Sequence, residues 1–163
     1  MKPIAVGSDD AGFPLKEILK GWLEEQGYEV QDFGAFSLDP VDYPDVAVEV
    51  ARAIAAGRYE RGVLICGTGI GMSITANKVR GVRAALAHDT YSAERARKSN
   101  DAQILTMGSR VIGPELAKRV LAAWLDAEFA GGPSKRKVEK IKRLDSPVES
   151  AKESKPEISS CRS

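Results

Sequence analysis

The stretch that decides the fold is residues 63–73, which read Val-Leu-Ile-Cys-Gly-Thr-Gly-Ile-Gly-Met-Ser. A short apolar run ends at Cys66, glycines follow at alternate positions, and residues 73–78 have the composition of a helix. This order predicts a buried parallel strand, a tight turn and the start of a helix. Glycine N–H groups at such a turn lie at the positive end of the helix dipole, where they stabilise an anion.

The same stretch places a thiol, a hydroxyl and an anion hole within a few residues of one another. Cys66 could move a proton, Thr68 could donate to a developing oxyanion, and the amides that follow could hold that oxyanion. A second interpretation also fits these residues: the glycines form a turn that packs close to the sheet, and Cys66 is a small core side chain. The candidate residues of this stretch are Cys66, Gly67, Thr68, Gly69, Ile70 and Gly71.

Outward from this stretch, apolar runs of strand length alternate with segments of helical period. Strands that are each followed by a helix predict a single-domain α/β fold, a Rossmann-like three-layer sandwich. It has a five-stranded parallel sheet, helices on both faces and a C-terminal arm helix. The predicted strands are residues 4–8, 28–33, 63–66, 82–87 and 104–108. The predicted helices cover residues 15–23 (ending at Gly27), 46–54 (capped by Asp45 and ending at Gly57), 73–79, 92–96, 114–129 and 134–144.

Composition narrows the classes of function. The 163 residues carry 24 Lys and Arg against 23 Asp and Glu, so no excess of charge favours nucleic acid or an anionic membrane as a partner. The two cysteines, at positions 66 and 161, make no disulfide framework, which favours a reducing compartment. No stretch approaches the length of an apolar membrane span, and the N-terminus lacks the pattern of a signal peptide. We therefore expect a soluble, cytoplasmic protein.

Polar residues follow four of the predicted strands. Each group taken alone is typical of an ordinary loop or helix cap. Since ligands bind to parallel sheets at the carboxyl ends of the strands, the four groups together predict a pocket on one rim. They are Ser8-Asp9-Asp10, Cys66-Gly67-Thr68, His88-Asp89 and Gly108-Ser109-Arg110.

The composition changes after Gly131-Gly132-Pro133. Residues 134–144 form a basic helix with an apolar stripe of Val138, Ile141 and Leu144, which must pack on something. A neighbouring subunit is one good possibility. We take residues 1–144 as the domain, with residues 134–144 as its basic arm helix, and residues 145–163 as a disordered tail.

Six motifs, in order along the chain, resemble one family. They are Gly7-Ser8-Asp9, Asp42-Tyr43-Pro44, residues 65–74, residues 76–79, Asn100-Asp101-Ala102 and residues 108–113. The pattern is similar to that of the ribose-5-phosphate isomerase B family, which includes galactose-6-phosphate isomerase subunits. The resemblance implies a cofactor-free aldose–ketose isomerase that works through a cis-enediolate. It also implies a homodimer or a dimer of dimers, with an active site completed by the neighbouring subunit; we assign no metal ligand.

The resemblance carries roles onto matching residues of this chain. Cys66 matches the base, and the glycine amides and helix N-terminus favour its thiolate. Thr68 matches the residue that assists proton movement between the two oxygens, and residues 67–71 match the enediolate hole. The positions that hold the sugar hydroxyls are Asp9, Tyr43 and Asn100, and Arg110 matches a phosphate ligand.

Three histidines that are usual in the family are absent. Asp10, Ser99 and Ser134 stand in their places, Pro133 replaces an arginine, and Lys137 stands where a downstream arginine is common. In the family, the histidine at position 99 is credited with opening the furanose ring, and the other two help to bind phosphate. Because a carboxylate at Asp10 repels an anion unless it is paired, we expect Arg110, Arg136 or Lys137 to hold the phosphate.

Substrate chemistry offers an explanation for serine, in place of the usual histidine, at position 99. A tetrose 4-phosphate has its 4-hydroxyl esterified and cannot close the furanose ring that a pentose 5-phosphate forms. An isomerase of a tetrose phosphate needs no ring-opening residue, and residues 87–100 also look like the branch of the family that acts in erythritol breakdown. His88, the one histidine of the chain, either takes over ring opening or is a loop or capping residue.

Two other functions are weighed against the isomerase. A dinucleotide-binding oxidoreductase is suggested by glycines after a strand and by Asp89 about twenty residues on, but the spacing is G-x-G-x-G and follows the third strand. A non-catalytic sugar-phosphate-binding homologue is the other, because a fold alone does not guarantee activity. The retained Cys66 and anion hole argue against it.

Overall fold

The computed structural model describes residues 2–146, and the structural statements below concern that part of the chain. Strands and helices alternate from β1 to α5, and a further helix follows. The strands are β1 (Ile4–Ser8), β2 (Val30–Asp32), β3 (Arg61–Cys66), β4 (Ala84–Leu86) and β5 (Ile104–Gly108). The helices are α1 (Phe13–Glu25), α2 (Tyr43–Ala55), α3 (Ile70–Asn77), α4 (Thr90–Lys98), α5 (Pro114–Leu125) and α6 (Pro133–Arg143).

The five strands form one parallel sheet in the order β2-β1-β3-β5-β4. From β1 the chain moves outward to β2 and then returns to place β3 on the other side of β1. The strand order therefore reverses between β1 and β3, whose carboxyl ends lie together in the register Ser8↔Ile65. Ligands of open α/β sheets bind outside such a reversal point.

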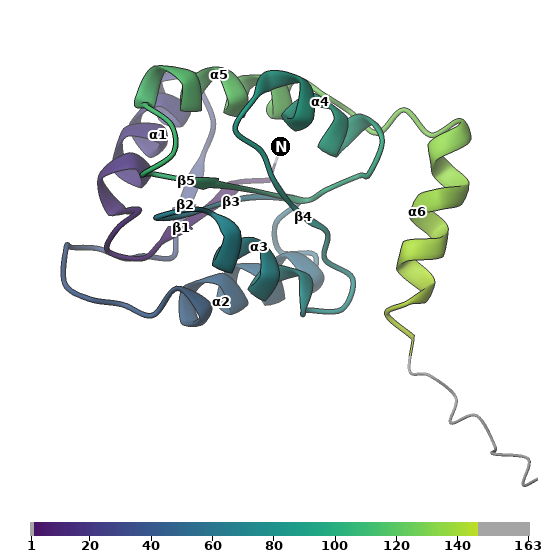
Figure 1. The fold of residues 1–163 in the computed structure, drawn as a ribbon, viewed down its shortest axis with the longest axis horizontal. Helices are drawn as coiled ribbons and strands as arrows, with labels where there is room; N and C mark the ends of the chain where they lie inside the picture. The colour runs from purple at the N-terminus through teal and green to yellow at the C-terminus, as the bar shows by residue number, and fades with distance from the viewer. Residues whose placement is uncertain (1, 147–163) are drawn as a thin grey trace, which may run out of the picture.

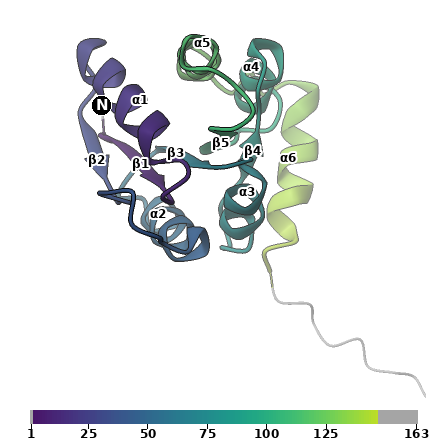
Figure 2. The same ribbon diagram turned by 60° about the vertical axis from the view of Figure 1, so that its left-hand side comes forward.

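Helices cover both faces of the sheet, which confirms the predicted three-layer sandwich (Figures 1 and 2). Helices α1, α4 and α5 share one hydrophobic core with the first face, centred on Trp124 and Leu19. Helices α2 and α3 share a second core with the other face, which includes Val50, Met72 and the side chain of Cys66. The apolar run at residues 63–66 alternates between the two cores, as a strand buried on both faces requires.

Some element boundaries differ from the prediction. Asp42 rather than Asp45 is the N-cap of α2, since Pro44 fits the first helical turn and Asp45 N–H donates to the Asp42 carbonyl oxygen. Strands β2 and β4 are only three residues long, shorter than their apolar runs suggested. Helix α5 ends at Leu125 rather than at Phe129, because the Arg61 guanidinium binds carbonyl groups at the end of this helix.

The arm helix α6 lies beyond the β4 edge of the sheet, outside the three layers (Figures 1 and 2). Of its apolar stripe, Val138 is buried, at 1% exposure, whereas Leu144 is 83% exposed. Lone helices of this length are marginal in water, so one buried side chain is a small share of what the helix needs. The predicted disordered tail lies, from residue 147 onward, outside the described residues.

Candidate active site

A cleft opens at the carboxyl ends of β1 and β3, where the strand order reverses. Its volume is about 490 Å³. Four chain segments that are distant in sequence meet there: the turn after β1, the start of α2, the glycine turn into α3 and the turn after β5. The lining residues are Asp9, Asp10, Ala11, Tyr43, Cys66, Gly67, Thr68, Ile70, Gly71, Ile74 and Arg110.

Cys66 ends β3 at the floor of this cleft and is 4% exposed. Its Sγ atom accepts a hydrogen bond from the N–H of Gly69 at 3.1 Å. Gly69 has φ +78°, and a Cβ atom there would lie 2.7 Å from the Met107 carbonyl carbon, so only glycine fits this turn. The turn thereby directs a backbone N–H at the sulfur.

Thr68 is exposed to the cleft, two residues after Cys66. Its Oγ1 atom accepts a hydrogen bond from Ile70 N–H at 3.2 Å, in the first turn of α3. Because a hydroxyl group has one proton to donate, this contact leaves the Thr68 proton available to a ligand. The first N–H groups of α3 lack intrahelical partners and lie at the positive end of its dipole. The site can therefore both donate to an oxyanion and stabilise it.

Tyr43, the first residue of α2, closes one side of the cleft. Its ring packs so closely on Gly71 that a Cβ atom at position 71 would lie 2.4 Å from a ring carbon. The phenol is therefore placed over the N-terminus of α3. Gly71 is needed here for close approach.

Asp9 follows β1 and is buried beside the cleft. Its Oδ1 atom accepts a hydrogen bond from Gly12 N–H at 2.8 Å. Burial raises the pKa of the Asp9 carboxyl above its usual value; the nearby Asp10 adds to this, and the Gly12 N–H and Arg110 oppose it. Perturbed carboxyl groups of this kind are typical of functional sites.

Asp10 and Arg110 bring opposite charges to the rim. Asp10 Oδ1 accepts a hydrogen bond from Val41 N–H at 3.2 Å, which ties the turn after β1 to the loop before α2. Arg110 N–H donates to the Gly67 carbonyl oxygen at 3.0 Å, and its guanidinium lies against Gly67. Among the described residues that line the cleft, Arg110 is the one cation.

His88 lies on the same rim but does not line the cleft. Its Nε2 atom accepts a hydrogen bond from Gly108 N–H at 2.8 Å, so the imidazole is neutral and carries its proton on Nδ1. Burial lowers the pKa of His88, and Asp89 opposes this in part. His88 thus supports the turn after β5.

Four further predicted residues are not brought to this cleft. Helix α4 starts at the carboxyl end of β4 and runs back along the sheet, which leaves Ser99 and Asn100 near its amino edge. Ser99 Oγ accepts a hydrogen bond from Arg95, and the Asn100 carbonyl oxygen accepts one from Arg83 Nε at 3.1 Å. Arg136 and Lys137 are exposed on α6 and line no part of the cleft.

The prediction missed two lining residues, Ala11 and Ile74. Ala11 directly follows Asp9-Asp10, so it could have been included with them. Ile74 stands four residues after Ile70 in α3, and this spacing puts both side chains on one face of the helix. Their exposure gives the cleft an apolar wall.

Within residues 2–146, no group of three or more His, Cys, Asp or Glu side chains is arranged to hold a metal ion. Membrane spanning was also searched for in the described part of the chain, and no helix there has the length and apolar character to cross a bilayer. Cys66 has a free thiol.

Known proteins share this chain's sequence over most of its length. Residues 4–141 match the family described as Ribose/Galactose Isomerase. A D-erythrulose-4-phosphate isomerase from Pectobacterium atrosepticum is 57% identical over 145 residues, which cover 86% of this chain and 93% of that protein. A ribose-5-P isomerase B from Listeria innocua is 54% identical over 142 residues, which cover 87% of this chain and 96% of that protein.

Known structures share the fold as well. The ribose-5-phosphate isomerase B of Clostridium thermocellum superposes with a TM-score of 0.86 at 46% identity, over 88% of this chain and 97% of that one. Together with the family match over residues 4–141, this agreement confirms the resemblance drawn from the motifs. By the family match, the relatives and the shared fold together, this chain belongs to the ribose/galactose isomerase family.

Proposed function

We propose that this protein is an aldose–ketose isomerase of a short phosphosugar that works by proton transfer through a cis-enediolate. The observation that carries the proposal is the cleft itself. It combines a cysteine that accepts a backbone N–H, a free hydroxyl, a buried carboxyl and one arginine at the reversal point of the sheet. Family membership supports the same reaction class.

Cys66 acts as the base. Its thiolate takes a proton from the carbon next to the carbonyl and returns it to the neighbouring carbon, which interconverts ketose and aldose. The amides of residues 67–71 that are not bonded to Cys66 Sγ or Thr68 Oγ1, together with the N-terminus of α3, stabilise the enediolate formed between these steps. Thr68 moves the proton between the two oxygens, since its hydroxyl both donates and accepts.

The remaining lining residues hold the substrate. Asp9 and Tyr43 bind sugar hydroxyls, and Arg110 binds the phosphate. Asp10, already bonded to Val41 N–H, keeps the anion on the Arg110 side of the cleft. This division places negative charge away from the two neighbouring carboxyl groups.

The protein forms a homodimer or a dimer of dimers in which a second copy completes the cleft. The positions of Asn100, Arg136 and Lys137 support this, because each is exposed and none lines the cleft of its own chain. In the assembly, Asn100 binds a sugar hydroxyl, and Arg136 or Lys137 adds positive charge beside Arg110. A cytoplasmic location goes with the proposal and is supported by the free thiol that the reaction needs.

A four-carbon phosphosugar is the preferred substrate class. His88 lies outside the cleft with Nε2 bonded to Gly108 N–H, and the Ser99 hydroxyl is a far weaker acid and base than an imidazole, so neither residue replaces a ring-opening histidine. A tetrose 4-phosphate needs none. The D-erythrulose-4-phosphate isomerase of Pectobacterium atrosepticum, 57% identical, supports the same substrate class.

The oxidoreductase alternative loses its basis, because the glycines follow β3 and the family match covers residues 4–141. A non-catalytic binding protein is disfavoured because the thiol of Cys66 and the hydroxyl of Thr68 both line the cleft, next to the N-terminus of α3.

The test compares isomerisation of D-erythrulose 4-phosphate and D-ribose 5-phosphate by the purified protein, with Cys66→Ala as the control. We expect activity on the tetrose to exceed that on the pentose at least about tenfold, and Cys66→Ala to abolish both. A Cys66→Ala variant with full activity contradicts the mechanism. Preference for the pentose contradicts the substrate class and leaves the isomerase reaction in place.

A further inference from the structure

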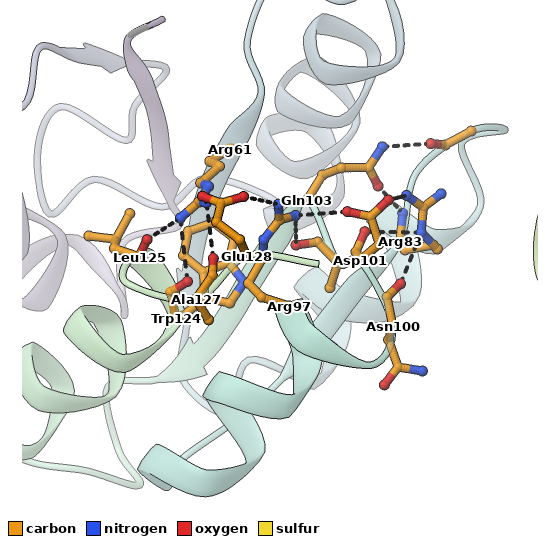
Figure 3. A network of polar contacts seen from close by, with 12 residues as sticks. Arg61, Arg83, Arg97, Asn100, Asp101, Gln103, Trp124, Leu125, Ala127 and Glu128 are labelled. Atoms are coloured by element: carbon orange, nitrogen blue, oxygen red, sulfur yellow. Dashed lines mark hydrogen bonds and ion pairs between the residues drawn. The ribbon is translucent and has the colours of Figure 1, made fainter. Parts of the chain in front are cut away.

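An alternating chain of charged side chains crosses the amino edge of the sheet (Figure 3). In order it runs Arg61, Glu128, Arg97, Asp101 and Arg83. Arg61 pairs with Glu128, whose Oε2 lies 3.7 Å from Arg97 Nη2. Arg97 Nη1 lies 3.3 Å from Asp101 Oδ1, and Arg83 Nη2 lies 3.0 Å from Asp101 Oδ2. This network of charged side chains thus connects the end of α5 to the turn that follows α4.

The three arginines of this network are unusually buried for charged groups, whereas Glu128 is exposed. Arg97 is 8% exposed, and the side chains of Arg61 and Arg83 are each 13% exposed. Burying charges costs desolvation free energy that their pairing repays only in part, so such a network is weak evidence for stability alone. What it does provide is one fixed geometry. The question is therefore which part of the molecule needs that geometry.

Asp101 is where the network acts on the backbone. It lies three residues after the end of α4 and has φ +50°, in the left-handed region where glycine is the usual residue, and its N–H donates to the Arg97 carbonyl oxygen at 3.0 Å. The two oxygens of its carboxylate are held by two different arginines. Arg83 Nε also donates to the carbonyl oxygens of Asn100, at 3.1 Å, and Asp101, at 3.0 Å.

The side chain of Asn100 stands apart from these contacts. Figure 3 shows it pointing away from the network, while its backbone is held by Arg83. The residue is exposed, and within residues 2–146 its amide group makes no hydrogen bond. A fixed backbone under a free polar side chain is the arrangement expected of a preorganised ligand-binding group.

Asn100 cannot serve the cleft of its own chain. It precedes β5 at the amino edge of the sheet, whereas the cleft lies at the carboxyl edge. Strand β5 has 5 residues, which at about 3.3 Å each separate the two edges by about 16 Å. A substrate that touches both Cys66 and Asn100 must therefore take them from two copies of the chain.

We propose that Arg83 and Arg97, acting through Asp101, are positioning residues that fix the turn 99–101 and so present Asn100 to the substrate in the cleft of a second copy. This inference rests on the proposed function. Preorganisation of the turn removes the cost of ordering it when substrate binds, and misplacing a substrate-binding group by about an ångström can cost about a hundredfold in rate.

The variant that tests the proposal is Asp101→Gly. Glycine adopts the positive φ readily, so the backbone path survives while both ion pairs are lost. We expect kcat/KM to fall about tenfold to a hundredfold. Arg61→Met is the matched control, because Arg61 is as buried as Arg83 but binds the end of α5 instead of the turn. It should lower the Tm and leave kcat/KM unchanged.

Mixed dimers separate positioning from general stability. In a dimer of one Asp101→Gly chain and one Cys66→Ala chain, one cleft combines an intact Cys66 with an intact turn from the partner. Random assortment then restores about a quarter of the wild-type sites, although each variant alone is nearly inactive. Differently tagged chains allow the mixed dimer to be isolated and its activity measured directly.

Recovery in the mixed dimer supports the proposal, and an isolated mixed dimer without recovery overturns it. A wild-type protein that is active as a monomer also overturns it. So does an Arg61→Met variant that has the same Tm as Asp101→Gly and loses as much kcat/KM. If wild-type protein isomerises neither substrate, or Cys66→Ala is fully active, the proposed function itself fails, and that result is visible before any chains are mixed.

Discussion

The chemistry of single residues in the cleft depends on neighbours that the backbone brings to them. The Cys66 sulfur accepts a backbone hydrogen bond because glycine at position 69 can turn its N–H toward it. The pKa of the Asp9 carboxyl is raised because the residue is buried at the end of β1 and lies close to Asp10. Histidine is the residue type that ordinarily titrates closest to neutral pH, but His88 accepts a hydrogen bond from Gly108 N–H through Nε2. Two of these residues give predictions that depend on pH.

Asp9→Asn is expected to stabilise the protein at neutral pH. Because the pKa of Asp9 is raised, the folded state holds this proton to a higher pH than the unfolded chain does. The ionised carboxyl therefore destabilises the fold once the pH exceeds the folded-state pKa, and the effect vanishes below its ordinary pKa. The asparagine oxygen can still accept from Gly12 N–H.

We expect the Tm of Asp9→Asn to rise by a few degrees at neutral pH and not in acid, while isomerase activity falls about tenfold or more. Thermal unfolding at both pH values, with the exposed Asp126→Asn as control, measures this. A loss of stability at neutral pH would show that the carboxylate is favourable where it stands.

His88→Gln tests the neutral imidazole. Since the pKa of His88 is lowered, the unfolded chain takes up this proton first as the pH falls, and stability contributed above the ordinary pKa of about 6.5 is lost below it. Glutamine can accept from Gly108 N–H but does not titrate. The drop in Tm between about pH 7.5 and about pH 5 should therefore be smaller in the variant.

The chain has one histidine, so NMR titration reads its pKa without overlap. A pKa at or above the ordinary value would contradict the geometry at Nε2.

At the scale of elements, one side of the cleft is formed where the start of helix α2 packs on the start of helix α3. The ring of Tyr43 sits on Gly71, so two helices from different parts of the chain are set at a distance that admits no Cβ atom. Gly71 thus serves packing between elements as well as the proposed anion hole.

Gly71→Ala should push the Tyr43 ring away and weaken substrate binding. We expect KM to rise about tenfold, with a smaller change in kcat, because a hydroxyl contact present in both ground and transition states is lost. Gly21→Ala is the control: it lies inside α1 with open space around its Cα, so alanine there should stabilise the fold by about 0.5–1 kcal/mol. Equal kinetic effects in both variants would contradict the role of the close approach.

How far the sequence predicts these elements can be judged from particular residues. The strands, the turn at residues 67–71 and the rim groups followed from local periodicity, which is read along the chain. The N-cap of α2 at Asp42 and the end of α5 at Leu125 did not, because Pro44 competes with Asp45 for the first turn and Arg61 comes from a strand distant in sequence. The bond from Gly108 N–H to His88 likewise depends on strand order, which no local pattern contains.

The candidate site divides in the same way. Asp9, Cys66, Thr68 and Arg110 meet in one cleft because each lies at or just after the carboxyl end of a strand, and Tyr43 reaches it from the start of α2. Asn100, Arg136 and Lys137 stand elsewhere, and their proposed roles depend on contacts between copies of the chain.

At the scale of the whole molecule, the arm helix α6 lies outside the three layers and buries one side chain, Val138. Arg110 is the one cation among the described residues that line the cleft, and we propose that lysines and arginines of α6 from a second copy add positive charge there. Lys137→Ala should therefore raise KM several-fold and lower kcat less, since phosphate binding is shared by ground and transition states.

Lys142→Ala, on the same helix but paired with Glu139, is the control and should behave as wild type. Steady-state kinetics of both variants measure the difference. A large loss of kcat at unchanged KM would contradict a binding role for Lys137.

The short strands at the two borders of the sheet have a consequence for association. Strands β2 and β4 are 3 residues long, while the inner strands have 5 or 6. Long, flat border strands recruit strands of other chains and promote aggregation, and very short ones give such recruitment little to build on. With β2 carrying Gln31 and Asp32 and α6 standing beyond β4, copies of this chain should join through helices and loops and never by extending the sheet.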